Sequence, residues 1–125
     1  MTEPLALVVY EKLLPGSQLV NRLQDLKYRV QTLSDPRQLT ITATEAKPMV
    51  VFLDLDEASG KDPCGAVKQL RENSATSHIP VVGFMMEAKP ETEEKARAAG
   101  VTVVATEAVL LNHLPQLLEQ ALHIE

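Results

Sequence analysis

Short apolar runs alternate along the chain with longer stretches in which apolar residues recur at helical spacing. The runs are rich in β-branched residues and predict five strands, at Leu5–Tyr10, Arg29–Leu33, Met49–Leu53, Val81–Met85 and Val101–Ala105. The stretches that follow them predict five helices, at Gly16–Leu26, Pro36–Ala46, Gly65–Asn73, Glu91–Ala99 and Leu110–His123. The runs at 6–9 and 49–53 are continuously apolar, which is typical of central parallel strands that are covered on both faces.

Strict alternation of strand and helix predicts parallel strands joined by right-handed crossovers, with helices on both faces of the sheet. Five strands favour the flavodoxin-like order 2-1-3-4-5, so the predicted fold class is α/β. In this order the first and third strands are neighbours, and ligands bind in the crevice beyond their carboxyl ends. The sequence contains no internal repeat, low-complexity segment or linker, and we expect residues 1–125 to form one domain.

Composition narrows the classes of function. The chain carries 12 Lys and Arg against 17 Asp and Glu, a net charge of −5, and only 3% aromatic residues. Nucleic-acid binding normally needs a cationic surface and stacking side chains, so contact with DNA or RNA is not expected. No stretch approaches the roughly 20 apolar residues of a membrane span. The single cysteine, Cys64, fits a reducing compartment, and we expect a cytoplasmic location.

Three acidic residues follow the two central strands. Glu11 comes directly after the first run, and Asp54 and Asp56 come directly after the third. Because the carboxyl ends of neighbouring parallel strands meet at one edge of the sheet, the predicted fold brings these carboxylates into one crevice. Carboxylate oxygens suit Mg²⁺, and a carboxylate beside such a cation can accept a phosphoryl group. Acids also suit a strand end that merely faces water, and spacing alone leaves both interpretations open.

From residue 4 to residue 122 the sequence resembles the CheY-like receiver domains of bacterial response regulators. The resemblance rests on residues 47–55, on 66–71 with 77–82, and on 95–100, taken in order. It implies a three-layer α/β/α fold with the strand order given above. It also implies a place in two-component signal transduction, in which a histidine kinase passes a phosphoryl group to a receiver domain.

The resemblance assigns roles to the three acids. In the family the phosphoryl acceptor is an Asp at the end of the third strand, and Asp54 matches that position. Glu11 matches one of the family's two metal-binding acids. Asp56 matches the residue whose backbone carbonyl completes the metal shell. The resemblance therefore implies that Asp54 is the phosphoacceptor and that Glu11, Asp54 and Asp56 surround a Mg²⁺ ion.

Four positions depart from the family's site. Tyr10 replaces the first metal-binding acid, and Met85 replaces the Ser or Thr that contacts the phosphoryl group. Val104 stands at the aromatic switch position, and Glu107 replaces a Lys that neutralises phosphoryl oxygens. An ion pair at about 4 Å is worth roughly 4 kcal/mol at an effective dielectric near 20. The reversed charge at Glu107 therefore disfavours a stable phosphoaspartate. Because Met85 and Val104 replace the hydroxyl and aromatic residues, the resemblance also implies that the family's usual pathway from phosphorylation to a conformational change of the surface is missing.

Residues elsewhere in the chain are candidates to supply the hydroxyl and the cation that the family's site contains and this sequence lacks at the matching positions. A threonine, Thr102 or Thr106, would supply the missing hydroxyl if the alignment slips beyond the long segment between residues 56 and 65. A lysine, Lys12 or Lys89, would supply the missing cation.

The departures predict an atypical receiver, or pseudo-receiver, that is not an enzyme and acts through protein–protein contacts. Because the sequence has no room for a second domain, we expect its output to pass through a separate molecule. The expected partners are a histidine kinase or a downstream effector. The resemblance implies that the fourth helix, fifth strand and fifth helix form the contact surface, including that of a homodimer. The alternative is a functional phosphoacceptor that a histidine kinase phosphorylates at Asp54.

A phosphatase is a further alternative, from a different class. Residues 52–56 resemble the Asp-x-Asp nucleophile motif of haloacid-dehalogenase-type phosphatases. In that motif the first Asp attacks phosphate and the second acts as acid and base. Glu57 and Ala58 stand where that family has a Gly and a hydroxyl residue, which weighs against this function. Release of phosphate without a partner kinase would distinguish it.

Overall fold

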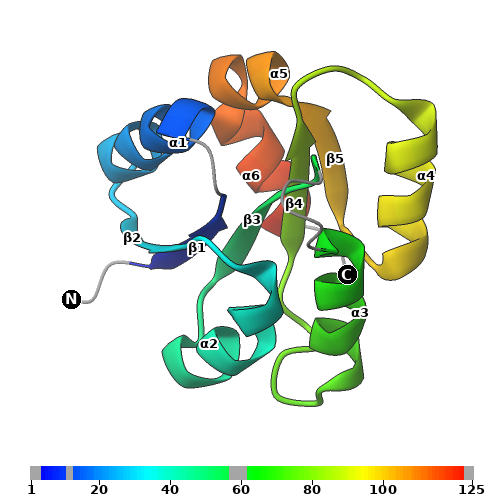
Figure 1. The fold of residues 1–125 in the computed structure, drawn as a ribbon. Helices are drawn as coiled ribbons and strands as arrows, with labels where there is room; N and C mark the ends of the chain where they lie inside the picture. Colours follow the sequence, from blue (N-terminus) through cyan, green and yellow to red (C-terminus); the bar gives the residue numbers. More distant parts are fainter. Residues whose placement is uncertain (1–3, 11–12, 57–61, 123–125) are drawn as a thin grey trace.

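The fold is a single parallel sheet between two layers of helices (Figure 1). The computed structural model describes residues 4–10, 13–56 and 62–122. The strands are β1 (Leu5–Val9), β2 (Arg29–Leu33), β3 (Val50–Asp54), β4 (Val81–Met85) and β5 (Val103–Thr106). All neighbouring strands pair in parallel, in the order β2-β1-β3-β4-β5. The predicted fold class and strand order are confirmed.

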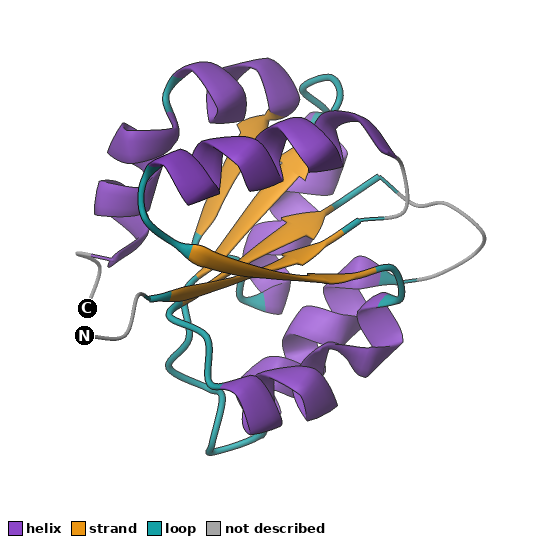
Figure 2. Cartoon of the chain, turned by 90° about the vertical axis from the view of Figure 1, so that its left-hand side faces the viewer, coloured by secondary structure: helices purple, strands orange, loops and turns teal. Residues whose placement is uncertain are grey.

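The helices cover both faces of the sheet, as Figure 2 shows. They are α1 (Leu13–Asp25), α2 (Leu39–Ala46), α3 (Pro63–Glu72), α4 (Pro90–Ala99), α5 (Glu107–Asn112) and α6 (Leu114–Leu122), with a short 3-10 turn η1 (Pro36–Gln38) before α2. Helices α1, α5 and α6 pack on one face, and α2, α3 and α4 pack on the other. None of the helices in the described ranges is long and apolar enough to cross a membrane.

The central strands are buried on both faces, which explains their continuous apolar runs. In β3, Val51 and Leu53 join the core cluster of α2, α3 and α4. Val50 and Phe52 join the cluster of α1, α5 and α6. Each such side chain contributes about 1.5–3 kcal/mol when it leaves water. This two-sided burial fixes β3 in the sheet and carries its carboxyl end, Asp54, to the edge.

Three strands differ from the prediction at their ends. The first ends at Val9 rather than Tyr10, and the third begins and ends one residue later, so Asp54 is its last residue. The fifth begins two residues later than predicted, at Val103, and ends one residue later, at Thr106. Before it, Thr102 lies in a bend, and its backbone N–H donates to the carbonyl of Val81. The hydroxyl of Thr102 also accepts the N–H of Val81, at 3.1 Å. These bonds hold the bend at the start of both strands.

The predicted last helix, Leu110–His123, is wrong: within the described range the chain forms two helices that meet at His113. Thr106 starts the first of them, because its hydroxyl accepts the backbone N–H of Val109. Pro115 has no N–H to continue that helix, but it is tolerated in the first turn of the next one. The first of the two helices therefore begins earlier than the apolar stripe suggests, and the second begins at Leu114, one residue before the proline.

Other helix starts also differ from the prediction, mostly because proline lies inside the first turn rather than before it. Helices α3 and α4 begin at Pro63 and Pro90. Helix α1 begins at Leu13. The stretch after Asp35 opens with the 3-10 turn, which Asp35 caps by accepting the backbone N–H of Arg37. None of these shifts changes which face of the sheet a helix covers.

Candidate functional site

The candidate site lies at the carboxyl ends of β1 and β3, which are neighbours in the sheet. Asp54 is half-buried and lies beside Phe84 in the pairing of β3 with β4. Asp56 follows two residues later, at the same edge. Glu11 lies outside the described residues, so its predicted pairing with Asp54 is not tested. The structure does bring Asp54 and Asp56 together at the predicted crevice.

The chain leaves β3 along a path that a glycine on β4 makes possible. The backbone N–H of Leu55 donates to the carbonyl of Phe84 at 2.8 Å, so the chain follows β4 for one more residue. A Cβ atom on Gly83 would lie 2.7 Å from Leu55 Cδ1. Asp54 Oδ1 then accepts the backbone N–H of Asp56 at 2.9 Å and turns the chain. This turn aims the carboxylate of Asp56 at the start of α4.

Both carboxylate oxygens of Asp56 have partners. Oδ2 accepts the backbone N–H of Met86 at 2.9 Å. Oδ1 lies 3.2 Å from the ammonium nitrogen of Lys89. The Asp56 side chain is 10% exposed and that of Lys89 is 54% exposed. The lysine left open by the sequence is therefore in the crevice, where it neutralises Asp56. Lys12, the other candidate, lies outside the described residues.

The four departing residues lie around this crevice in apolar or helical surroundings. Tyr10 is half-buried against the core cluster of α1, α5 and α6. Met85 is the buried last residue of β4, and Val104 packs beside it against the cluster of the other face. Glu107 is the first residue of α5. Their positions agree with the order of the resemblance, while their chemical roles rest on the resemblance alone.

Thr102 does not replace the hydroxyl that Met85 lacks. It lies at the opposite edge of the sheet, where its hydroxyl accepts the N–H of Val81. Thr106 pairs with Met85 at the carboxyl edge, where its hydroxyl accepts the N–H of Val109 and caps α5. At the end of β4 itself, a phosphoryl group on Asp54 would meet the apolar side chains of Phe84 and Met85.

The described part of the crevice does not by itself form a metal site. Within residues 4–10, 13–56 and 62–122, no group of three or more His, Cys, Asp and Glu side chains could hold a metal ion. Mg²⁺ requires near-octahedral oxygen coordination, and the oxygens of Asp56 already accept two hydrogens. The predicted Mg²⁺ site at Glu11, Asp54 and Asp56 stays a prediction.

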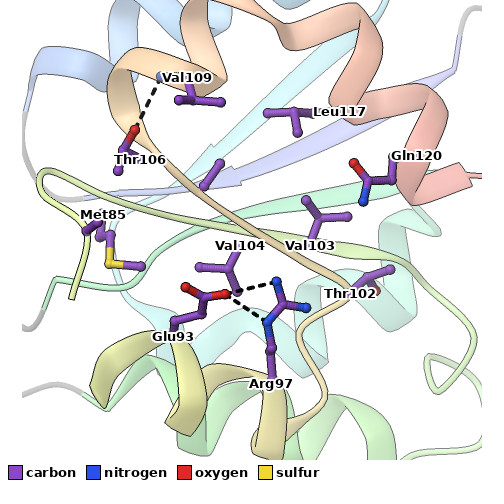
Figure 3. Close-up of a pocket in the computed structure, with 12 residues that line it drawn as sticks. Met85, Glu93, Arg97, Thr102, Val103, Val104, Thr106, Val109, Leu117 and Gln120 are labelled. Carbon is purple, nitrogen blue, oxygen red and sulfur yellow. Dashed lines mark hydrogen bonds and ion pairs between the residues drawn. The ribbon is translucent and has the colours of Figure 1, made fainter. Parts of the chain in front are cut away.

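A second concave region lies between α4, β5 and the last two helices (Figure 3). It has a volume of about 270 Å³. Val104 points from β5 toward an ion pair on α4, in which Arg97 lies 3.1 Å from Glu93. Val109, which is 43% exposed, lines the other side. The region combines an apolar floor with a charged rim, as protein-binding surfaces do.

A polar cluster that the sequence does not predict lies at the opposite edge of the sheet. Arg71 of α3 donates to the carbonyl oxygens of Ser77, Ile79 and Gly100 at 2.6–3.0 Å. It also donates to the Thr102 hydroxyl at 3.3 Å. Burial lowers the pKa of Arg71. No local sequence signal announces this role, because the four acceptors come from two loops that follow α3 and α4.

Solved structures of receiver domains share this fold. The chain is similar to the chemotaxis protein CheY4 of Vibrio cholerae, with 22% identity, a TM-score of 0.84, and coverage of 96% of this chain and 99% of that one. It is also similar to a LuxR-family two-component response regulator from Aurantimonas, with 19% identity, a TM-score of 0.83, and coverage of 97% and 86%. A candidate response regulator from Chloroflexus aurantiacus gives 15% identity, a TM-score of 0.89, and coverage of 98% and 100%.

These identities establish the CheY-like, flavodoxin-like fold and no more. No protein-family model and no curated protein matches the chain.

Proposed function

We propose that the chain is a receiver-like signalling domain of a two-component system, working in the cytoplasm through contacts with other proteins. Its acidic crevice lies where a receiver accepts its phosphoryl group, and Asp54 is a poor acceptor. The observation that carries the proposal is the position of Asp54, the last residue of β3 at the carboxyl edge of a 2-1-3-4-5 sheet. The similar solved structures, described as a chemotaxis protein and response regulators, support the same assignment.

The surroundings of Asp54 support poor acceptance. A phosphoryl group adds a charge of about −1.5 to −2 and three oxygens that need donors or cations. At the end of β4, Phe84 and Met85 are buried and apolar and provide no such donor. Glu107 begins α5 where the family has a lysine. A phosphorylated Asp54 would therefore gain little stabilisation from β4 and α5.

A functional phosphoacceptor is the second candidate, and Lys89 favours it. Its ammonium group lies 3.2 Å from Asp56 and supplies positive charge to the same crevice. In that case a histidine kinase would be the partner. Lys89 at the start of α4 would then take the role that the family gives to a lysine at the end of the fifth strand. A phosphatase is less well supported, because Asp56 would have to exchange protons while both of its oxygens hold partners.

The concave region beside α4, β5 and α5 is the proposed contact surface for an effector or a second copy of the chain. Exposed apolar side chains in such a region mark contact sites when polar residues surround them. Val109 is the central test residue, and Ile41 provides a matched control because it is 66% exposed on α2, which does not line this region.

Sedimentation over a range of concentrations tests the dimer. If the surface self-associates, the parent gains mass with concentration, Val109→Glu stays monomeric, and Ile41→Glu behaves as the parent does. A parent that stays monomeric at every concentration would contradict the dimer and leave the effector as the proposed partner. Equal loss of association in both variants would move the interface away from α4, β5 and α5.

A further inference from the structure

A pocket lined by basic residues lies at the amino edge of the sheet, where β1, β3 and β4 begin. It has a volume of about 420 Å³, and its basic residues are Arg29, Lys47 and His78. We propose that this pocket binds a small organic phosphate, a monoester whose phosphate group meets the basic residues and whose apolar part meets the floor of the pocket. The inference goes beyond the proposed function, because no residue of the pocket belongs to the crevice at the opposite edge.

The charge of this pocket is opposite to that of the whole chain. The chain has a net charge of −5, yet none of the described residues that line the pocket is an Asp or a Glu. Within the described part of the chain, no ion pair joins Lys47 or His78 to a carboxylate. A phosphate monoester carries a charge of about −1.5 to −2 near pH 7 and three acceptor oxygens. The positive charges of Arg29 and Lys47, together with a ring nitrogen of His78, match that charge and those oxygens.

Lys47 has a backbone conformation that a lysine disfavours. It ends α2 with a φ of 53° and a ψ of 58°, in the left-handed region. Glycine is the usual residue there, and Pro48 further favours an extended backbone at the residue before it. The cap uses only the backbone N–H of Lys47, which donates to the carbonyl of Ala43 at 2.9 Å. The cap therefore does not explain a lysine at this position, and strained residues of this kind cluster at ligand sites.

The floor of the pocket is apolar. Leu5, Met49 and Ile79 line it, and Met49 is 49% exposed. The remaining lining residues are three prolines, Pro4, Pro48 and Pro80. These side chains can cover a ring or a short carbon chain that is attached to the phosphate group.

The pocket is also formed before a ligand binds. Each of its prolines has a fixed φ. The backbone N–H of Met49 donates to the carbonyl of Leu5 at 2.8 Å, and that of Arg29 donates to the carbonyl of Pro4 at 2.8 Å, so the starts of three strands are joined. A preformed site lowers the entropic cost of binding. Its volume also lies in the range of about 300–1,000 Å³ that small-molecule sites occupy.

The experiment is a titration of the protein with phenyl phosphate at low, constant ionic strength, followed through the backbone amide signals of Leu5, Met49 and Ile79 in two-dimensional NMR. Inorganic phosphate and phenol are titrated separately, because each carries only one half of the probe. We expect phenyl phosphate to bind at least about tenfold more tightly than either of them, because only phenyl phosphate meets both the basic residues and the apolar floor.

Two matched variants locate the site. Lys47→Gly removes the charge and relieves the backbone, so the variant should fold as the parent does. Lys27→Gly makes the same change at a φ of 71°, at the same edge of the sheet but outside the pocket. Lys47→Gly should bind phenyl phosphate about tenfold more weakly than the parent, and Lys27→Gly should match the parent within about threefold.

Several outcomes would overturn the inference. They are no response of the three amide signals to phenyl phosphate, equal affinity in the parent and Lys47→Gly, an equal loss in Lys27→Gly, and inorganic phosphate or phenol binding as tightly as phenyl phosphate. A loss of binding in Asp54→Asn would also overturn it, because the probe would then occupy the crevice at the carboxyl edge. The amide spectrum of each variant reports whether it is folded. The titration uses neither partner nor acyl phosphate, so its failure leaves the proposed function standing.

Discussion

The two edges of the sheet carry polar clusters of different charge and different construction. At the amino edge, Arg71 donates to three backbone carbonyl oxygens and a hydroxyl. At the carboxyl edge, Asp56 accepts one backbone N–H and one lysine ammonium. The first cluster is built almost entirely from main chain and cannot exchange its partners without unfolding loops. The second relies on a half-exposed side chain that can leave.

This difference predicts different energetic costs for breaking the two clusters. Hydrogen bonds to a charged group contribute about 1.5–3 kcal/mol each when they are buried. An ion pair with one exposed partner is worth about 0–1 kcal/mol. Removing the cation should therefore lower stability strongly at the amino edge and only slightly at the carboxyl edge.

The largest expected effect is at Arg71. Arg71→Met keeps the aliphatic part of the side chain but leaves the carbonyls of Ser77, Ile79 and Gly100 without this donor. We expect the free energy of unfolding to fall by about 3 kcal/mol, measured by urea denaturation. The matched control is Arg97→Met, which removes an exposed ion pair with Glu93 and should cost less than about 1 kcal/mol. Similar losses in both variants would contradict the contrast between the two edges.

The second effect concerns the glycine that Arg71 packs against. Gly100 ends α4 at a φ of 114°, in the left-handed region, and a Cβ atom there would lie 2.8 Å from Arg71 Cγ. Gly100→Ala should lower the free energy of unfolding by about 1–3 kcal/mol through backbone strain and crowding. Urea denaturation measures it, and a smaller cost in an Arg71→Ala background, which lacks the Cγ atom, would show that crowding contributes. An unchanged midpoint for Gly100→Ala would refute this view of the cap.

A smaller loss of stability is expected at Asp56. Asp56→Asn keeps the size of the side chain and removes the charge that pairs with Lys89. We expect a loss of about 1 kcal/mol or less, because one carbonyl oxygen still accepts the N–H of Met86. The same denaturation experiment gives the value, and a cost as large as that of Arg71→Met would show that the crevice is structural.

The smallest effect is expected from Lys89→Met. Because Lys89 is 54% exposed, its ion pair should contribute about 0–1 kcal/mol, and salt should reduce this further. Unfolding at low and high ionic strength measures the contribution. A loss that is large and independent of salt would mean that the Lys89 ion pair stabilises the fold as the Arg71 cluster does.

The sequence predicts the sheet well because its signals are local and repeated. Continuous apolar runs predict β1 and β3, and their order brings Asp54 and Asp56 to one crevice. The break between α5 and α6 is not predicted, because the apolar stripe of Leu114–Leu122 indicates one continuous helix. The cap at Thr106 and the proline at Pro115, which decide the break, are signals of one residue each.

The contacts that distinguish the two edges lie beyond such local signals. The sequence offers Lys12 and Lys89 as candidates for the missing cation, and only the path of α4 places Lys89 beside Asp56. The sequence gives Arg71 no role, because its acceptors are mainly backbone carbonyl oxygens, which every residue possesses. Polar contacts between segments that are far apart in the sequence depend on the paths of the loops between them. The pattern of apolar residues determines those paths only roughly.

The most direct test of the central claim is the intact mass of the protein after incubation with a small acyl phosphate and Mg²⁺, with Asp54→Asn treated in parallel. Poor acceptance at Asp54 predicts that the parent remains almost entirely unmodified and releases no phosphate. A stable increment of one phosphoryl group on most of the parent, absent from Asp54→Asn, would contradict the claim and establish a working phosphoacceptor. Steady, Asp54-dependent release of phosphate from a phosphate monoester, in place of the acyl phosphate, would identify a phosphatase instead.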